Sequence, residues 1–192
     1  FTNYPGENSQ VLYGEGVFVG YRWDDTRGIE VAFPFGHGLS YTTFEWGEPK
    51  ITKLPSSQEL IDGKTVDIKI SVTNTGDRAG TEVVQCYVEH VEPVLARPKK
   101  ELKGFQKISL EPGETKDVEI NLGSRSFSYW DPADPDWPER SIRVPVAAGG
   151  RKSGPGHRAI EGWYADPGLY KAHLGVSATN LKAEIDINID EN

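Results

Sequence analysis

Asp24 and Asp25 form an adjacent pair of carboxylates whose residue types could serve acid–base chemistry. Two carboxyl groups held close together can divide the roles of general acid and of base or nucleophile between them. Adjacent side chains in a loop usually diverge, however, and Arg22 and Arg27 flank the pair as candidate salt-bridge partners. We therefore expect Asp24 and Asp25 to have a structural role in a loop over residues 22–28.

Cys86 is the single cysteine of the chain, so neither an internal disulfide nor a cysteine-rich metal site is available. It lies in an apolar run over residues 83–88, and no base stands near it in the sequence. A nucleophilic thiol needs such a base or a positive helix end. We therefore expect Cys86 to be a buried structural thiol.

Metal and phosphate sites find little support in the remaining motifs. The four histidines show no ligand spacing, so no metal site and no cofactor are expected; they are His37, His90, His157 and His173. The segment GGRKSG at residues 149–154 has the wrong order of residues for a phosphate-binding loop, and no strand-to-helix pattern surrounds it. It is expected to be a flexible loop.

Length and charge limit the classes of partner. The 192 residues suffice for one sandwich-sized domain plus an extra segment. The 29 acidic and 21 basic residues give a formal net charge of −8, which argues against a nucleic-acid partner. No stretch has the length of apolar residues that a membrane span or a signal peptide requires. The start at Phe1 and the absence of Met lead us to expect a fragment or a processed subunit, and leave a cytoplasmic or a secreted location open.

The elements that would position these residues fall into two parts. Residues 1–42 are rich in glycine and aromatic residues, with a strand-like alternation over residues 17–21. Such a segment cannot build a core alone, so it is predicted to close a preceding α/β domain. Residues 43–192 show period-two alternation between turn signals, as in residues 66–72, 118–122, 170–174 and 181–189. This pattern predicts a mainly β domain, an immunoglobulin-like antiparallel β-sandwich.

Several motifs resemble, in order along the chain, the C-terminal region of family 3 glycoside hydrolases of the β-glucosidase type. The segments GEGVFVGYR at 14–22 and PFGHGLSYT at 34–42 are similar to the end of the second catalytic domain of that family. Five further segments are similar to the fibronectin type III-like domain that follows it: VTNTG at 72–76, RPK at 97–99, ELKGF at 101–105, PGET at 112–115 and SYWD at 128–131. The ordered set covers most of the chain.

This resemblance implies that the chain is a non-catalytic part of its enzyme. The family's retaining mechanism uses an aspartate nucleophile from a first, barrel-like domain and an acid/base carboxylate from the second, about 5–5.5 Å apart. The family's nucleophile motif and its Lys-His sugar-binding motif are absent from this chain, and Asp136-Trp137 is the nearest dipeptide, placed among prolines. Catalysis would therefore need upstream domains, joined covalently or present as a second chain. These domains are the expected partner, and a β-glycoside substrate is expected to bind through them.

Trp23 is the one candidate substrate-binding residue. Aromatic side chains stack on the C–H faces of sugar rings, so Trp23 could line the outer, leaving-group side of the parent active site. Packing between domains is the alternative role. A stand-alone carbohydrate-binding or adhesive module is the alternative function, and would need an exposed row of aromatic residues.

The long insertion at about residues 131–162 is the main departure from the family pattern. Loops of this length in compact domains often carry function. The insertion is expected either to shape the rim of the active site or to be a surface excursion.

Overall fold

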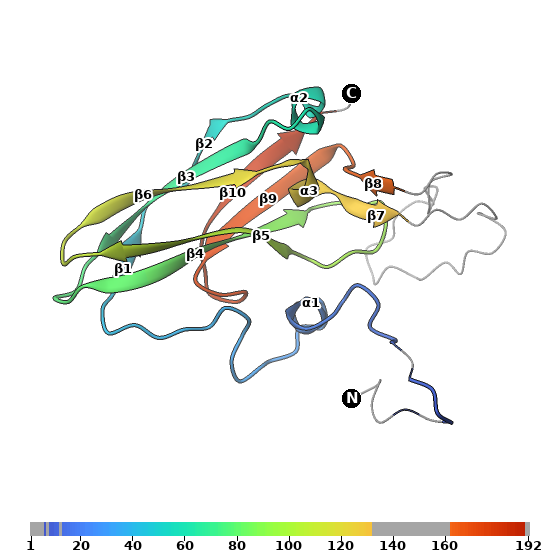
Figure 1. The fold of residues 1–192 in the computed structure, drawn as a ribbon, viewed down its shortest axis with the longest axis horizontal. Coiled ribbons are helices and arrows are strands. Elements are labelled where there is room, and N and C mark those ends of the chain that lie inside the picture. Colours follow the sequence, from blue (N-terminus) through green and yellow to red (C-terminus); the bar gives the residue numbers. More distant parts are fainter. Residues whose placement is uncertain (1–5, 7, 12, 132–161, 191–192) are drawn as a thin grey trace.

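The computed structural model of the chain describes residues 6, 8–11, 13–131 and 162–190. These residues form two antiparallel sheets packed face to face, a segment that runs along one side, and a two-stranded ribbon at one end (Figure 1). The antiparallel β-sandwich predicted from the alternating segments is thereby confirmed. Among the described residues, no helix has the length and apolar composition to cross a membrane.

The first sheet is built around β3 (Val66–Asn74), which pairs along its length with β6 (Thr115–Leu122). Two short strands share the other edge of β3: β2 (Lys50–Lys53) lies beside its start and β1 (Phe44–Trp46) beside its end. The first strand of the sandwich thus begins at Phe44.

The second sheet has the order β10-β9-β4-β5, with every pair antiparallel. Its strands are β4 (Gly80–His90), β5 (Glu101–Leu110), β9 (Gly168–Gly175) and β10 (Leu181–Ile189). β9 and β10 contain the alternating segments predicted at 170–174 and 181–189, and β4 contains the apolar run around Cys86. Cys86 is fully buried, as expected, and this burial raises the pKa of its thiol to about 12.

The core lies between the two sheets and is built from the alternate residues of their strands. β3 alternates between fully buried Val66, Ile68, Ile70 and Val72 and more accessible polar residues. The other sheet supplies Val84, Cys86 and Leu174. Every buried member of this core lies between residues 60 and 189, so the N-terminal segment contributes none.

β4 is buried on both faces, which a half-exposed strand would not be. Five consecutive residues, 84–88, are buried. Val84, Cys86 and Val88 face the core, and the N-terminal segment covers the opposite side at Gln85 and Tyr87. A strand covered on both faces has a continuous apolar run instead of alternation, which is the pattern found at residues 83–88.

Short helices accompany the sheets in the described part of the chain. α2 (Ser57–Ile61) begins with a capping box, in which Ser56 and Glu59 exchange side-chain and backbone hydrogen bonds. α3 (Ser124–Phe127) buries Phe127 against Tyr170. Neither helix was predicted, because each is too short to produce a helical stripe in the sequence.

The N-terminal segment differs from the expected strand followed by a loop. Residues 17–19 form no strand, and residues 21–27 form the helix α1 (Tyr21–Arg27). Gly28 ends this helix in the left-handed conformation at φ 64°, and the cap's N–H groups bond to the carbonyls of Asp24 and Asp25. Asp24 in the first turn and Arg27 in the last also complement the helix dipole. The glycine after the helix and the charges at its two ends favour a helix more strongly than the short alternation at residues 17–21 favours a strand.

The ribbon at the end of the sandwich consists of β7 (Tyr129–Asp131) and β8 (Gly162–Tyr164). Asp131 lies opposite Gly162, so the two ends of the predicted insertion meet at this ribbon. The rest of the insertion, with Asp136-Trp137, the segment at 149–154 and His157, lies outside the described residues.

Candidate functional site

An ion pair anchors α1 to the start of β5. Both carboxylate oxygens of Asp25 lie 2.7 Å from Nζ of Lys100, and the two side chains are only 15% and 5% exposed. Asp25 is therefore bound to a buried cation from the sandwich, and it does not form a carboxylate pair with Asp24. The structural role expected for this residue is the one observed, although Lys100 takes the place of Arg22 and Arg27 as its partner.

Glu101 is the centre of a second group of charges at the same junction. Its carboxylate lies 3.3 Å from Nε of Arg22, 3.6 Å from Nη2 of Arg97 and 3.3 Å from Nζ of Lys103. Burial lowers the pKa of Lys103, and Glu101 acts against this shift. We call these residues and the preceding pair the α1–β5 ion cluster: Arg22, Asp25, Arg97, Lys100, Glu101 and Lys103. Four cations and two carboxylates give this cluster a formal charge of +2.

Aromatic rings complete the contact between the N-terminal segment and the sandwich. The ring of Tyr21 stacks on Phe35 with centroids 4.6 Å apart, and approaches Tyr87 edge-on at 6.0 Å. The hydroxyl of Tyr21 accepts a hydrogen bond of 2.8 Å from the backbone N–H of Leu102. Tyr21 therefore holds the start of α1 against both β4 and β5.

Gly36 and Gln85 fix the segment farther along the chain. The side-chain amide of Gln85 donates to the carbonyl of Gly36 at 3.3 Å and to that of Val176 at 2.6 Å. Gly36 has φ 81°, and a Cβ at this position would collide with the Gln85 amide. Only glycine meets both requirements without strain, which explains why a glycine follows Phe35.

Trp23 lies on α1 and is half-buried, with the guanidinium of Arg27 4.6 Å from the centre of its ring. It is outside the core of the sandwich. The structure thus brings Trp23 together with Arg27, a cation–π contact that limits the movement of the indole. A sugar contact for Trp23 stays a prediction.

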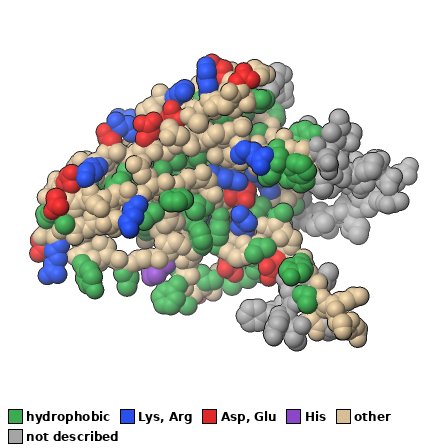
Figure 2. Space-filling model, viewed as in Figure 1, with side chains coloured by type: hydrophobic (Ala, Val, Ile, Leu, Met, Phe, Trp, Pro, Cys, Tyr) green, Lys and Arg blue, Asp and Glu red, His purple; other side chains and the backbone are tan. Residues whose placement is uncertain are grey.

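The N-terminal segment exposes many large apolar side chains. Leu39 and Tyr41 are each 94% exposed, and Tyr13 is 84% exposed. Six further residues between positions 11 and 35 are about half-exposed or more: Val11, Val17, Val19, Ile29, Phe33 and Phe35. Figure 2 shows hydrophobic side chains gathered along the side of the molecule where this segment runs. Apolar surface of this extent marks an interaction face.

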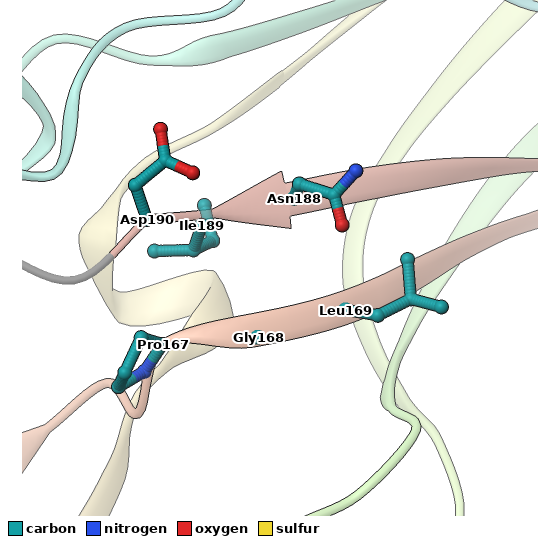
Figure 3. Close-up of a pocket in the computed structure, with 6 residues that line it drawn as sticks. All are labelled: Pro167, Gly168, Leu169, Asn188, Ile189 and Asp190. Atoms are coloured by element: carbon teal, nitrogen blue, oxygen red, sulfur yellow. The ribbon is translucent and has the colours of Figure 1, made fainter.

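A hollow of the described surface lies where β9 begins and β10 ends (Figure 3). It has a volume of about 350 Å³ and is lined by Pro167, Gly168, Leu169, Asn188, Ile189 and Asp190. A neighbouring hollow of about 250 Å³ shares its Pro167–Leu169 wall and adds His90, Val91 and Glu92. Each hollow has one carboxylate in its wall, whereas glycoside hydrolysis requires two.

Burial raises the pKa of one carboxyl group on β4, that of Glu82. A raised pKa is typical of a general acid. Burial is the only influence that raises the pKa of Glu82, while the N–H of Val83 and Lys182 lower it, so the shift does not come from a second carboxylate. Within the described residues, no three His, Cys, Asp or Glu side chains gather closely enough to hold a metal ion.

Two tryptophans on the ribbon form an exposed pair that was not predicted. Trp130 on β7 lies directly opposite Trp163 on β8, and the two are 47% and 46% exposed. Each tryptophan stands beside a tyrosine in the sequence. Successive residues of a strand point to opposite faces, so one of the two aromatic rings would face outward. The partnership of the two tryptophans was hidden because the long insertion separates them along the chain.

Comparison with known proteins matches residues 82–150 to the fibronectin type III-like domain. The chain is 47% identical over 137 residues, 71% of its length, to thermostable beta-glucosidase B of Acetivibrio thermocellus. It is 38% identical over 186 residues, 97% of its length, to a beta-glucosidase of Rhizobium radiobacter. These matches span only 18% and 19% of the two relatives.

Solved structures give the same result. The crystal structure of a GH3 beta-glucosidase from Bifidobacterium adolescentis matches 98% of the chain with a TM-score of 0.74 and 34% identity, over 23% of its own length. The likeness includes the N-terminal segment as well as the sandwich. The chain therefore belongs to the family 3 glycoside hydrolases, as a C-terminal, fibronectin type III-like part homologous to that of β-glucosidases.

Proposed function

We propose that this chain supports the catalytic domains of an enzyme that hydrolyses terminal β-glycosidic bonds. In this proposal, residues 1–42 complete an upstream α/β domain and residues 43–192 form the sandwich that buttresses it. The catalytic carboxylates come from the upstream polypeptide, so the chain alone is not catalytic.

The main support for this proposal is that the N-terminal segment has one side fixed to the sandwich and another that exposes apolar side chains. One side of it is fixed to the sandwich by the Asp25–Lys100 pair and by Tyr21. The side chains of Tyr13, Leu39 and Tyr41 remain almost fully exposed. Burial of apolar side chains is the main favourable term in association. A segment that is held in place and exposes these side chains is suited to dock onto a further domain.

The test compares the longer polypeptide with and without these 192 residues, using aryl β-glucosides as substrates. We expect activity only when the chain is present, either fused or added as a second polypeptide. The isolated chain should show none. Turnover by the isolated chain, or full activity of the upstream part without it, would refute the proposal.

We further propose that Trp23 lies at the outer, leaving-group side of that active site. Its half-buried indole is braced by Arg27 and belongs to the segment that faces the upstream domains in this proposal. Trp23→Ala should then raise KM for aryl β-glucosides more than it lowers kcat, and Trp23→Phe should restore most of the loss. An unchanged KM in Trp23→Ala would remove this role.

A further inference from the structure

The ribbon formed by β7 and β8 presents an aromatic corner on its outer face. The indoles of Trp130 and Trp163 have centroids 5.6 Å apart and planes inclined at 64°. The guanidinium of Arg125, on the neighbouring α3, lies 3.4 Å from the centre of the Trp163 ring. All three side chains are exposed. Figure 2 shows hydrophobic and basic side chains together at this end of the molecule. We call these three residues the aromatic corner.

The elements that carry the aromatic corner are held in place. α3 buries Phe127, whose carbonyl accepts a hydrogen bond of 3.3 Å from Nη1 of Arg97. The hydroxyl of Ser128 donates to the carbonyl of Ser124 at 2.7 Å, which closes the end of the helix. On the ribbon, the hydroxyl of Tyr129 donates to Asp166 at 3.3 Å. A preformed site loses little entropy on binding.

We propose that the aromatic corner binds the pyranose rings of a neutral oligosaccharide. One face of a pyranose ring presents C–H groups that stack on an indole. The N–H donors of the Arg125 guanidinium lie in its own plane, and its central carbon is 3.4 Å from the centre of the Trp163 ring, so these donors can reach hydroxyl groups of a sugar bound beside that ring. Stacking and hydrogen bonding are thus available at one place.

The size of the patch favours a sugar over a protein partner. At less than half exposure each, the two indoles offer about 200 Å² of surface. A stable protein interface buries about 1,200–2,000 Å² in total. Beyond β5, these tryptophans are the only large hydrophobic residues that are exposed in the described part of the chain. The area suits one or two sugar rings.

The charge of the chain favours a neutral ligand. A formal charge of −8 opposes the approach of an acidic polysaccharide, even though Arg125 carries a local positive charge. The choice of β-linked glucose oligosaccharides as the first probe rests on the proposed function. The binding site itself does not depend on it, so xylo- and manno-oligosaccharides belong in the same experiment.

The experiment is a titration of the full 192-residue chain with cellotetraose, followed by NMR of the tryptophan indole N–H groups. We expect the signals of Trp130 and Trp163 to shift with a Kd of about 1 mM, and the signal of Trp46 on β1 to stay in place. Trp130→Ala and Arg125→Met should each weaken binding by about tenfold or more. Phe105→Ala, at a 66% exposed position on β5, is the matched control and should bind normally.

Circular dichroism checks that each variant is folded. If a variant does not fold, the titration of the unaltered chain still tests the proposal. Binding of another neutral oligosaccharide in place of cellotetraose would keep the site and count against the proposed substrate. No shift with any of the sugars would overturn the inference. Self-association of the chain through these tryptophans, detected by sedimentation and abolished in Trp130→Ala, would overturn it as well.

Discussion

Removing the charge of Asp25 should detach α1 from the sandwich without unfolding the sandwich. In Asp25→Asn, the ammonium of Lys100 would stay at a 5% exposed position without its carboxylate. Removing one partner of a buried ion pair costs about 3–5 kcal/mol, because the remaining charge is left uncompensated. Asp25 is itself 15% exposed, so water can enter, and we expect a value of about 3 kcal/mol.

This cost falls on the docking of α1, because α1 contains no buried residue and the core contains nothing from the N-terminal segment. The loss of global stability therefore cannot exceed the docking free energy. Hydrogen exchange followed by mass spectrometry should show faster exchange in residues 20–43 of Asp25→Asn, with unchanged exchange in β3 and β4.

Two variants provide the controls. Asp24→Asn alters the neighbouring carboxylate on the same helix and should cost less than about 1 kcal/mol, the size of a helix-dipole effect. The double variant Asp25→Asn/Lys100→Met removes both charges and should recover most of the lost protection, since no charge stays buried. Equal exchange in Asp25→Asn and Asp24→Asn would refute the reasoning, and so would a double variant as damaged as the single one.

Three further expectations concern the sandwich. Asn74→Leu should lower the free energy of unfolding in urea by about 3 kcal/mol, because the buried amide of Asn74 bonds the carbonyl of Leu110; a loss under about 1 kcal/mol would contradict this. The hydrogen bond to His173 lowers the pKa of Glu89, so its stabilisation is present above about pH 4.5 and is lost as the pH falls through the lowered pKa. Glu89→Gln should therefore lose less stability than the unaltered chain on acidification, and equal losses would argue against this link. With a thiol pKa of about 12, Cys86 should react with a thiol reagent only on unfolding, and rapid labelling of the folded chain near neutral pH would exclude its burial.

Four strands of the sandwich, β3, β6, β9 and β10, could be predicted because their apolar residues recur with a period of two, as burial of one face requires. Val66, Ile68 and Ile70 are spaced as β3 places them, and turn residues follow at 74–77. The sequence analysis predicted a loop where α1 lies. Seven residues form only two helical turns, too few for a helical period to appear in the sequence. Gly28 was the usable signal, since a glycine after Arg27 favours a helix end.

Contacts between distant segments could not be predicted from local patterns. Lys100 reaches Asp25 across 75 positions, and nothing in either neighbourhood indicates the other. The same holds for Trp130 and Trp163, which the ribbon places opposite each other. Trp23 was selected for its residue type alone. Its contact with Arg27 is local, four positions along the helix, and could have been predicted once a helix was recognised.

The distribution of polarity across the N-terminal segment suggests an order of assembly. Its contacts with the sandwich are specific and largely polar: the Asp25–Lys100 pair, the Tyr21 hydroxyl and the carbonyl of Gly36. Such contacts fix a position precisely but add little net free energy each. Its exposed apolar side chains can add more when a further domain buries them. We therefore expect the sandwich to set the position of the segment first, and docking of a further domain to supply most of the free energy that holds the assembly together.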